Sequence, residues 1–229
     1  MLQVARRGAA SLGESAELVR AFLRRCVGPQ GGGVDRAGRD DLYYTIFLVA
    51  GMQALNEELP VDALRRYLER FGDGEGLDFV HLGALARCWA AVGDVPRGLA
   101  DALLQRLEAF RSADGAYEGE AGAAEGNAYG CFVAMGAYQD LGRALPNPLQ
   151  MVQALKFLET PDGAWGNVRG LQTGSTNATA AAVTLLHQLE MPVAASAGRW
   201  LLGQIDPQGG FRAMPKAPIP DLLSTATAL

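Results

Sequence analysis

Hydrophobic and polar positions follow two alternating patterns along this chain. In the first pattern the apolar residues keep to one helical face, as Val61, Leu64 and Leu68 do, while charged residues such as Arg65 and Glu69 fill the other face. Such a segment predicts an amphipathic helix with one side exposed to water. We expect helices of this kind near 14–27, 61–71, 96–111, 147–159 and 192–204.

In the second pattern apolar residues surround most of the helix. Segment 40–56 carries Leu42, Tyr43, Ile46 and Phe47 around its circumference, which is typical of a helix buried on both sides. Similar segments lie near 78–92, 127–141, 176–190 and 221–229. A residue with a side-chain oxygen suited to an N-cap stands at the start of each: Asp40, Asp78, Asn127, Thr176 and Asp221.

Glycine-rich turns recur between the two kinds of helix. Taking Gly32, Gly74, Gly115, Gly163 and Gly209 as markers, the spacings are roughly 42, 41, 48 and 46 residues, a period typical of repeat proteins. Small residues of the apolar segments, among them Gly51 and Gly130, favour close helix packing at a tight centre. The prediction is therefore an all-α fold, an α/α toroid (barrel) of about five helical hairpins with alternating inner and outer helices. A straight solenoid of helix pairs is the alternative, and in either case residues 1–229 form a single domain.

Composition narrows the function classes. The formal net charge of −5 argues against a nucleic-acid-binding surface, which needs a basic stripe. No apolar run reaches the length of a membrane span, and residues 1–30 lack a secretory pattern, so we expect a cytoplasmic protein. Cys26, Cys88 and Cys131 lie far apart inside helical patterns and are expected to be reduced core residues.

Three stretches carry a family resemblance. A glycine turn followed by Asp, an aromatic or leucine residue, Thr and an apolar helix occurs at 31–45 and again at 209–225, and an aromatic-glycine turn occurs at 162–166. These stretches are similar to the repeats of protein prenyltransferase β subunits and squalene/hopene cyclases. The resemblance implies a toroid, an isoprenoid substrate, and prenyl transfer or cyclisation as the activity. The repeats fall short of the family's full ring, so the ring is predicted to be open, completed by a homodimer partner or second subunit, or cut short at Leu229.

The chain departs from the family's catalytic patterns. Leu42 stands where the family's zinc-binding cysteine would be, and Tyr44 and Ser224 stand where its histidine would be. Only Asp78 and His81 keep an Asp-x-x-His spacing, which leaves open whether this pair binds a metal. The acidic motif by which the cyclases protonate an alkene is also missing. We therefore expect no cofactor and no bound zinc, treat His81 as a cap-region histidine with a satisfied hydrogen bond, and assign no catalytic residue.

The remaining candidate is a ligand site at the starts of the inner helices. In a toroid these N-termini converge, and their free backbone N–H groups favour an anion such as a diphosphate, while aromatic and apolar inner faces suit an isoprenoid tail. The candidate ligand-binding residues are Arg36, Arg39, Asp40, Tyr43, Tyr44, His81, Tyr129, Arg169, Arg212 and Lys216. Two other functions stay open. One is a non-catalytic toroid scaffold or interaction protein, and the other is a carbohydrate-active α/α barrel that would use Glu118, Glu120 or Glu125.

Overall fold

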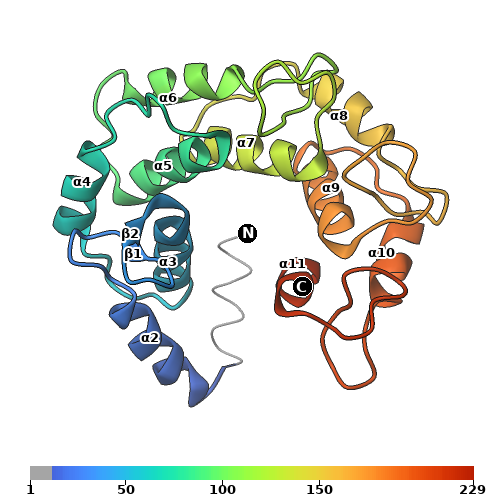
Figure 1. The fold of residues 1–229 in the computed structure, drawn as a ribbon, viewed down its shortest axis with the longest axis horizontal. Helices are drawn as coiled ribbons and strands as arrows, with labels where there is room; N and C mark the ends of the chain where they lie inside the picture. Colours follow the sequence, from blue (N-terminus) through green and yellow to red (C-terminus); the bar gives the residue numbers. More distant parts are fainter. Residues whose placement is uncertain (1–11) are drawn as a thin grey trace. The chain divides into compact units, whose positions relative to one another are not determined.

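The computed structural model describes residues 12–229, and these residues confirm the all-α prediction (Figure 1). They form ten α-helices and one two-stranded hairpin. The amphipathic helices are α2 (Ser15–Arg25), α4 (Val61–Glu69), α6 (Leu99–Glu108), α8 (Pro148–Lys156) and α10 (Ala195–Leu202). The apolar helices are α3 (Leu42–Ala54), α5 (Phe79–Val92), α7 (Ala128–Asp140), α9 (Thr176–Gln188) and α11 (Leu222–Ala228), and the strands are β1 (Gly33–Val34) and β2 (Asp40–Asp41). The predicted order of alternating helices is confirmed.

The chain divides into two compact units. Unit 1 contains the residues up to Leu107 together with Ala137–Arg143, and unit 2 contains Glu108–Gly136 and Ala144–Leu229, so α7 contributes to both. In unit 1, α3 packs on α5, while α2 contacts α3 and α4 contacts α5. In unit 2, α9 packs on α11 and contacts α10. The apolar helices α3 and α5, and likewise α9 and α11, therefore contact each other, and the amphipathic helices α2, α4 and α10 pack against them.

A threonine hydroxyl, buried in two cases and half-buried in the third, holds the turn of three repeats against the following helix. Thr45 Oγ1 accepts a hydrogen bond from the Gly33 N–H at 2.8 Å and donates to the Asp41 carbonyl at 2.6 Å. Thr179 bonds in the same way to the Trp165 N–H and the Ser175 carbonyl, and Thr225 to the Phe211 N–H and the Asp221 carbonyl. We call this arrangement the threonine bridge. It explains why a threonine recurs four residues after the helix cap in these repeats.

The loops between turn and apolar helix are closed by aspartates of the turn. Asp114 accepts hydrogen bonds from the backbone N–H groups of Ala116 and Gly126, the two ends of its loop. Asp162 reaches across the next loop to the Gly174 N–H. Each loop thus begins and ends at fixed backbone positions.

The predicted N-caps are right for three helices and wrong for two. Asp78, Asn127 and Asp221 each accept a backbone N–H from the first turn, as predicted. The predicted cap Asp40 is wrong, because its Oδ1 accepts from the Gln30 and Gly32 N–H groups and anchors the preceding turn. The neighbouring residue, Asp41, caps α3.

The predicted cap Thr176 is wrong for a similar reason. Its hydroxyl donates to the Arg212 carbonyl, 36 residues away in sequence, and Ser175 caps α9. At both helix starts two polar residues adjoin, and one of them bonds to a turn outside the helix while the other caps it.

Three details of the glycine pattern also differ from the prediction. The residue that matches Gly115, Gly163 and Gly209 is Gly31, with a positive φ of 95°, and not Gly32. A Cβ on Gly130 would lie 2.2 Å from the Tyr117 carbonyl oxygen, so this glycine makes room for its own repeat's turn and not for another apolar helix.

Gly51 likewise faces a different neighbour from the one predicted, since a Cβ there would contact the Leu23 side chain of α2.

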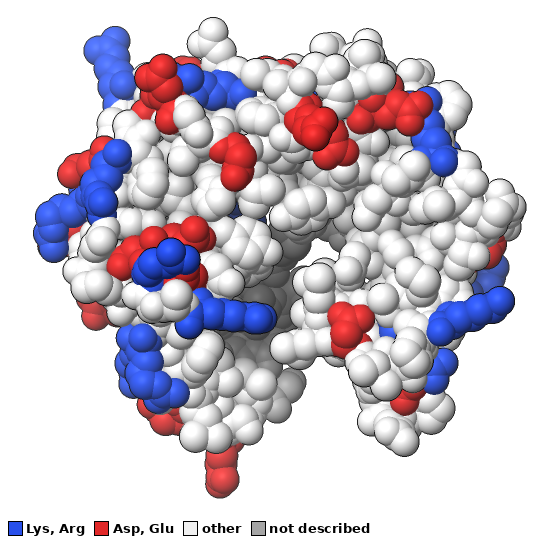
Figure 2. Space-filling view, viewed as in Figure 1, with Lys and Arg blue, Asp and Glu red and all other residues white. Residues whose placement is uncertain are grey.

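None of the helices within residues 12–229 has the length and apolarity needed to cross a bilayer. On the face shown in Figure 2, basic and acidic side chains lie interspersed over the part of unit 1 that contains α4 and the hairpin.

Candidate functional site

The β1–β2 hairpin of unit 1 sets the start of α3. Its turn is closed by Asp35, which accepts hydrogen bonds from the Ala37 and Arg39 N–H groups at 2.7 and 2.9 Å and from the Arg39 guanidinium. The bond from the Arg39 N–H is the main cause that holds the pKa of Asp35 below its usual value. Gly38 supplies the positive φ that the turn requires. The hairpin therefore delivers Asp41 to a fixed place at the helix start.

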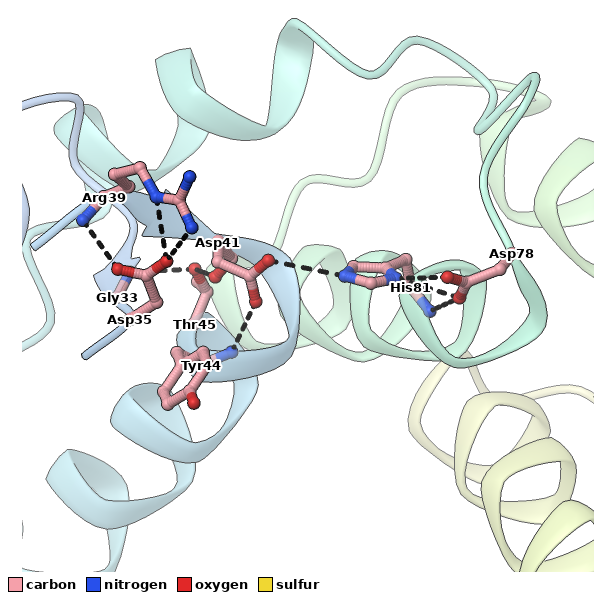
Figure 3. A network of polar contacts seen from close by, with 8 residues as sticks. All are labelled: Gly33, Asp35, Arg39, Asp41, Tyr44, Thr45, Asp78 and His81. Atoms are coloured by element: carbon pink, nitrogen blue, oxygen red, sulfur yellow. Dashed lines mark hydrogen bonds and ion pairs between the residues drawn. The ribbon is translucent and has the colours of Figure 1, made fainter. Parts of the chain in front are cut away.

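Asp41 is the junction of the site. Its Oδ1 accepts the Tyr44 N–H at 3.2 Å and so caps α3, while its Oδ2 lies 3.4 Å from Nε2 of His81 on α5. The Thr45 threonine bridge fixes the Asp41 backbone from the other side. Figure 3 shows Asp41 between the Asp35–Arg39 pair and His81.

His81 lies between two carboxylates. Its Nδ1 is 2.8 Å from both oxygens of Asp78, which also accepts the His81 backbone N–H at 2.9 Å. Burial acts to lower the pKa of His81, but the hydrogen bonds and charges of Asp78 and then Asp41 outweigh it, and the pKa is raised. Burial would likewise raise the pKa of Asp78, yet the bonds from His81 hold it below its usual value. The prediction of a cap-region histidine with satisfied hydrogen bonds is confirmed.

This arrangement can hold and exchange a proton. The His81 side chain is 31% exposed, so the imidazole is within reach of solvent and of a ligand on the surface. The raised pKa favours the protonated imidazole, which can donate a charge-assisted hydrogen bond from each ring nitrogen.

An exposed aromatic face adjoins this network. Tyr43, Tyr44 and Phe47 on α3 are 37%, 37% and 58% exposed, and we call them the aromatic face. The Tyr43 ring makes edge contacts with Tyr44 and Phe47, at centroid distances of 5.7 and 4.9 Å. The prediction that α3 is buried on both sides is therefore wrong, because only its Leu42, Thr45, Ile46, Leu48, Val49 and Met52 stripe is buried.

The other predicted residues of unit 1 have separate roles. Arg36 is exposed in the hairpin turn, and Arg39 is paired with Asp35 at 2.9 Å. Asp40 anchors the Gln30–Gly32 turn, and its Oδ2 is buried without a hydrogen-bond partner. Thus Tyr43, Tyr44 and His81 lie at or beside the aromatic face and its network, whereas both arginines belong to the turn.

The four remaining predicted residues belong to unit 2. Arg169 pairs with Asp114 at 2.5 Å and with Glu125 at 3.2 Å, and its guanidinium lies over the Phe157 ring. Arg212 pairs with Asp206 at 2.6 Å.

Lys216 is exposed in the loop before α11, and Tyr129 is 47% exposed on α7. Three arginines expected to meet an anion, Arg39, Arg169 and Arg212, therefore each have a carboxylate partner within their own unit.

The predicted site residues form no metal centre within residues 12–229, and they do not line the depression at the start of α4. Among residues 12–229, no group of three or more His, Cys, Asp or Glu side chains is arranged to hold a metal ion. A shallow depression of about 510 Å³ at the start of α4 is lined by Glu58–Ala63 and Arg66 and includes no predicted site residue. We therefore place the candidate site on the aromatic face and the Asp41–His81–Asp78 network.

Sequence reasoning missed three residues of this site. The sequence predicts Asp40 and not Asp41 as the cap, and it predicts a buried Phe47. It gives Asp35 no role. An Asp-x-x-Gly turn at 35–38 was a readable signal for the role of Asp35.

In comparisons with known proteins, no protein-family model and no curated protein matches this chain.

Proposed function

We propose that this chain is a helical-repeat protein that binds an isoprenoid or another apolar-tailed small molecule on the aromatic face of α3. The observation that carries the proposal is the exposure of three adjoining aromatic rings, Tyr43, Tyr44 and Phe47, beside the Asp41–His81–Asp78 network. The resemblance to prenyltransferase β subunits and squalene/hopene cyclases gives the ligand class. The toroidal arrangement of the hairpins remains a prediction from the sequence.

Most of the binding affinity should come from the apolar tail of the ligand. Covering apolar surface contributes about 25 cal/mol per Å², and aromatic rings present large, rigid areas for such contact. A diphosphate would have to compete with Asp35 for Arg39. We therefore expect farnesol and farnesyl diphosphate to bind with similar affinity, with any advantage of the diphosphate arising from Arg36 and Arg39.

Calorimetric titration of the whole chain with farnesol and farnesyl diphosphate tests whether an apolar-tailed ligand binds on the aromatic face. Replacing Tyr43, Tyr44 and Phe47 together by alanine should weaken both ligands at least roughly tenfold, since one buried aromatic side chain can contribute more than 1 kcal/mol. The matched control is Phe22→Ala on α2, where the side chain is 57% exposed against 58% for Phe47. Failure of both ligands to bind the natural chain, or equal loss in the control, would show that the proposal is wrong.

A second candidate function is a scaffold that binds another protein chain. It is favoured by the fact that the arginines and the histidine predicted to carry chemistry already serve the turns and caps of their own units. Exposed apolar side chains also occur on the amphipathic helix α2, where Leu18 is 74% exposed. Sedimentation analysis over a concentration series tests self-association, and a monomer that binds farnesol would favour the first candidate.

A further inference from the structure

His81 connects the starts of two successive apolar helices. Asp78 caps α5, on which His81 lies, and Asp41 caps α3, 40 residues earlier in the chain. Both carboxylates also accept a first-turn backbone N–H, so each is held in place before it meets the imidazole.

The geometry selects one protonation state. A neutral imidazole carries a single N–H, so it can donate to only one of two carboxylates. The other ring nitrogen would then face a carboxylate oxygen with its lone pair. Only the imidazolium can donate to both Asp78 and Asp41. The Nδ1 contact with Asp78 is 2.8 Å and the Nε2 contact with Asp41 is 3.4 Å, so loss of a proton should release Asp41 and keep Asp78.

The charges that act on the imidazole are those of Asp78 and Asp41. Asp35 and Arg39 pair with each other on the far side of Asp41 (Figure 3). From α4, the buried Tyr67 phenol lies beside Thr45, and its pKa is raised to about 12, chiefly by burial, so it stays neutral. Titration of His81 therefore decides whether Asp41 has a charged partner.

We propose that Asp41, His81 and Asp78 form a proton-operated latch that regulates ligand binding at the aromatic face. The regulatory part rests on the proposed function. With His81 protonated, Asp41 is held between the imidazolium and the Tyr44 N–H, and the first turn of α3 is fixed together with Tyr43 and Tyr44. With His81 neutral, Asp41 loses its contact with α5, and the first turn of α3 is held by its cap alone.

The sign of the pH dependence follows from the raised pKa of His81. A group whose pKa is higher in the folded state stabilises that state fully below its unfolded value, about 6.5 for histidine, and loses this contribution as pH rises through the folded value. The latch is therefore closed in mildly acidic solution and opens in the alkaline direction. Because the groups are partly exposed, we expect a change of roughly two- to fivefold in ligand affinity.

Nuclear magnetic resonance titration of the imidazole nitrogens in the full chain tests the latch without a ligand. The same imidazole in the urea-unfolded chain is the reference. We expect His81 to titrate at a higher pH in the folded chain than in the unfolded chain, and the variant Asp41→Asn to lower the His81 pKa, because asparagine keeps the cap oxygen and removes the charge. The matched control is Asp221→Asn at the cap of α11, which should leave His81 unchanged. If folded His81 titrates at or below its value in the unfolded chain, or if Asp41→Asn leaves the His81 pKa unmoved, the latch is refuted.

Calorimetry with farnesol at pH 6 and pH 9 tests the regulatory step. Weaker binding at pH 9 in the natural chain, and a flat response in Asp41→Asn, would support it. If farnesol binds equally at both pH values while His81 titrates as expected, the regulation is refuted and the proposed function stands. If farnesol binds at neither pH, the proposed function and the regulation that rests on it both fail, while the titration still decides whether the latch exists.

Discussion

The threonine bridge predicts a specific cost for replacing Thr45 by valine. The two side chains have nearly the same shape, so Thr45→Val changes the hydroxyl to a methyl group and little else. Thr45 is fully buried, and its hydroxyl satisfies the buried Gly33 N–H at 2.8 Å. Leaving a buried donor without a partner costs about 1–3 kcal/mol, while the added buried methyl returns at most about 0.8 kcal/mol. We expect the free energy of unfolding of unit 1 to fall by about 1–2 kcal/mol.

Urea denaturation combined with amide hydrogen exchange measures this effect and locates it. Exchange should become faster at Gly33 and in the first turn of α3, and should be unchanged in α9, where Thr179 forms the equivalent bridge. Thr45→Ser keeps both hydrogen bonds and should keep the Gly33 amide protected even if it lowers stability through the lost methyl. The exposed loop residue Thr173 is the control, and Thr173→Val should lie within about 0.5 kcal/mol of the natural chain. A protected Gly33 amide in Thr45→Val would refute the role given to the hydroxyl.

Two further predictions concern the turns and the core. Gly31 and Gly38 both have a positive φ, 95° and 77°, but a Cβ would lie 2.4 Å from the Ala63 carbonyl at Gly31 and meet nothing within 4 Å at Gly38. Gly38→Ala should therefore cost about 1–2 kcal/mol in thermal unfolding and Gly31→Ala clearly more, and equal costs would contradict this account. Burial raises the pKa values of the Cys88 and Cys131 thiols to about 12, so iodoacetamide should modify the half-buried Cys26 first and the other two only on unfolding, as mass spectrometry can show.

The alternation of helices was predictable because it depends on local periodicity. The amphipathic segment of 61–71 corresponds to α4 and the apolar segment of 78–92 to α5. In both segments the spacing of apolar residues indicates which helix faces are buried. The choice between Asp40 and Asp41 as the cap was not predictable in this way. It depends on which carboxylate meets the Gln30 and Gly32 N–H groups, and that is set by the path of the chain.

The candidate site was only partly predictable for the same reason. Tyr43, Tyr44 and His81 were identified from residue type and position, but the exposure of Phe47 depends on which side of α3 packs against the other helices. The partner of Arg169 lies 55 residues earlier in sequence, at Asp114, and no local pattern indicates such a pair. The sequence therefore predicts that these loop arginines are available to an anion, whereas in the fold they form ion pairs with carboxylates.

The closed loops of the repeats bear on how such a protein can change over evolutionary time. Asp114 and Asp162 fix the two ends of their loops, and the Thr179 bridge secures the turn before the second loop against α9. Residues added between those ends need not disturb the helices, because lengthening a flexible loop costs little. Insertions should therefore be tolerated between Gly119 and Gly122, because the Ala123 and Ala124 carbonyls and Arg169 bond to the preceding turn and must stay in place. New surface chemistry can arise there while the helical scaffold is inherited unchanged.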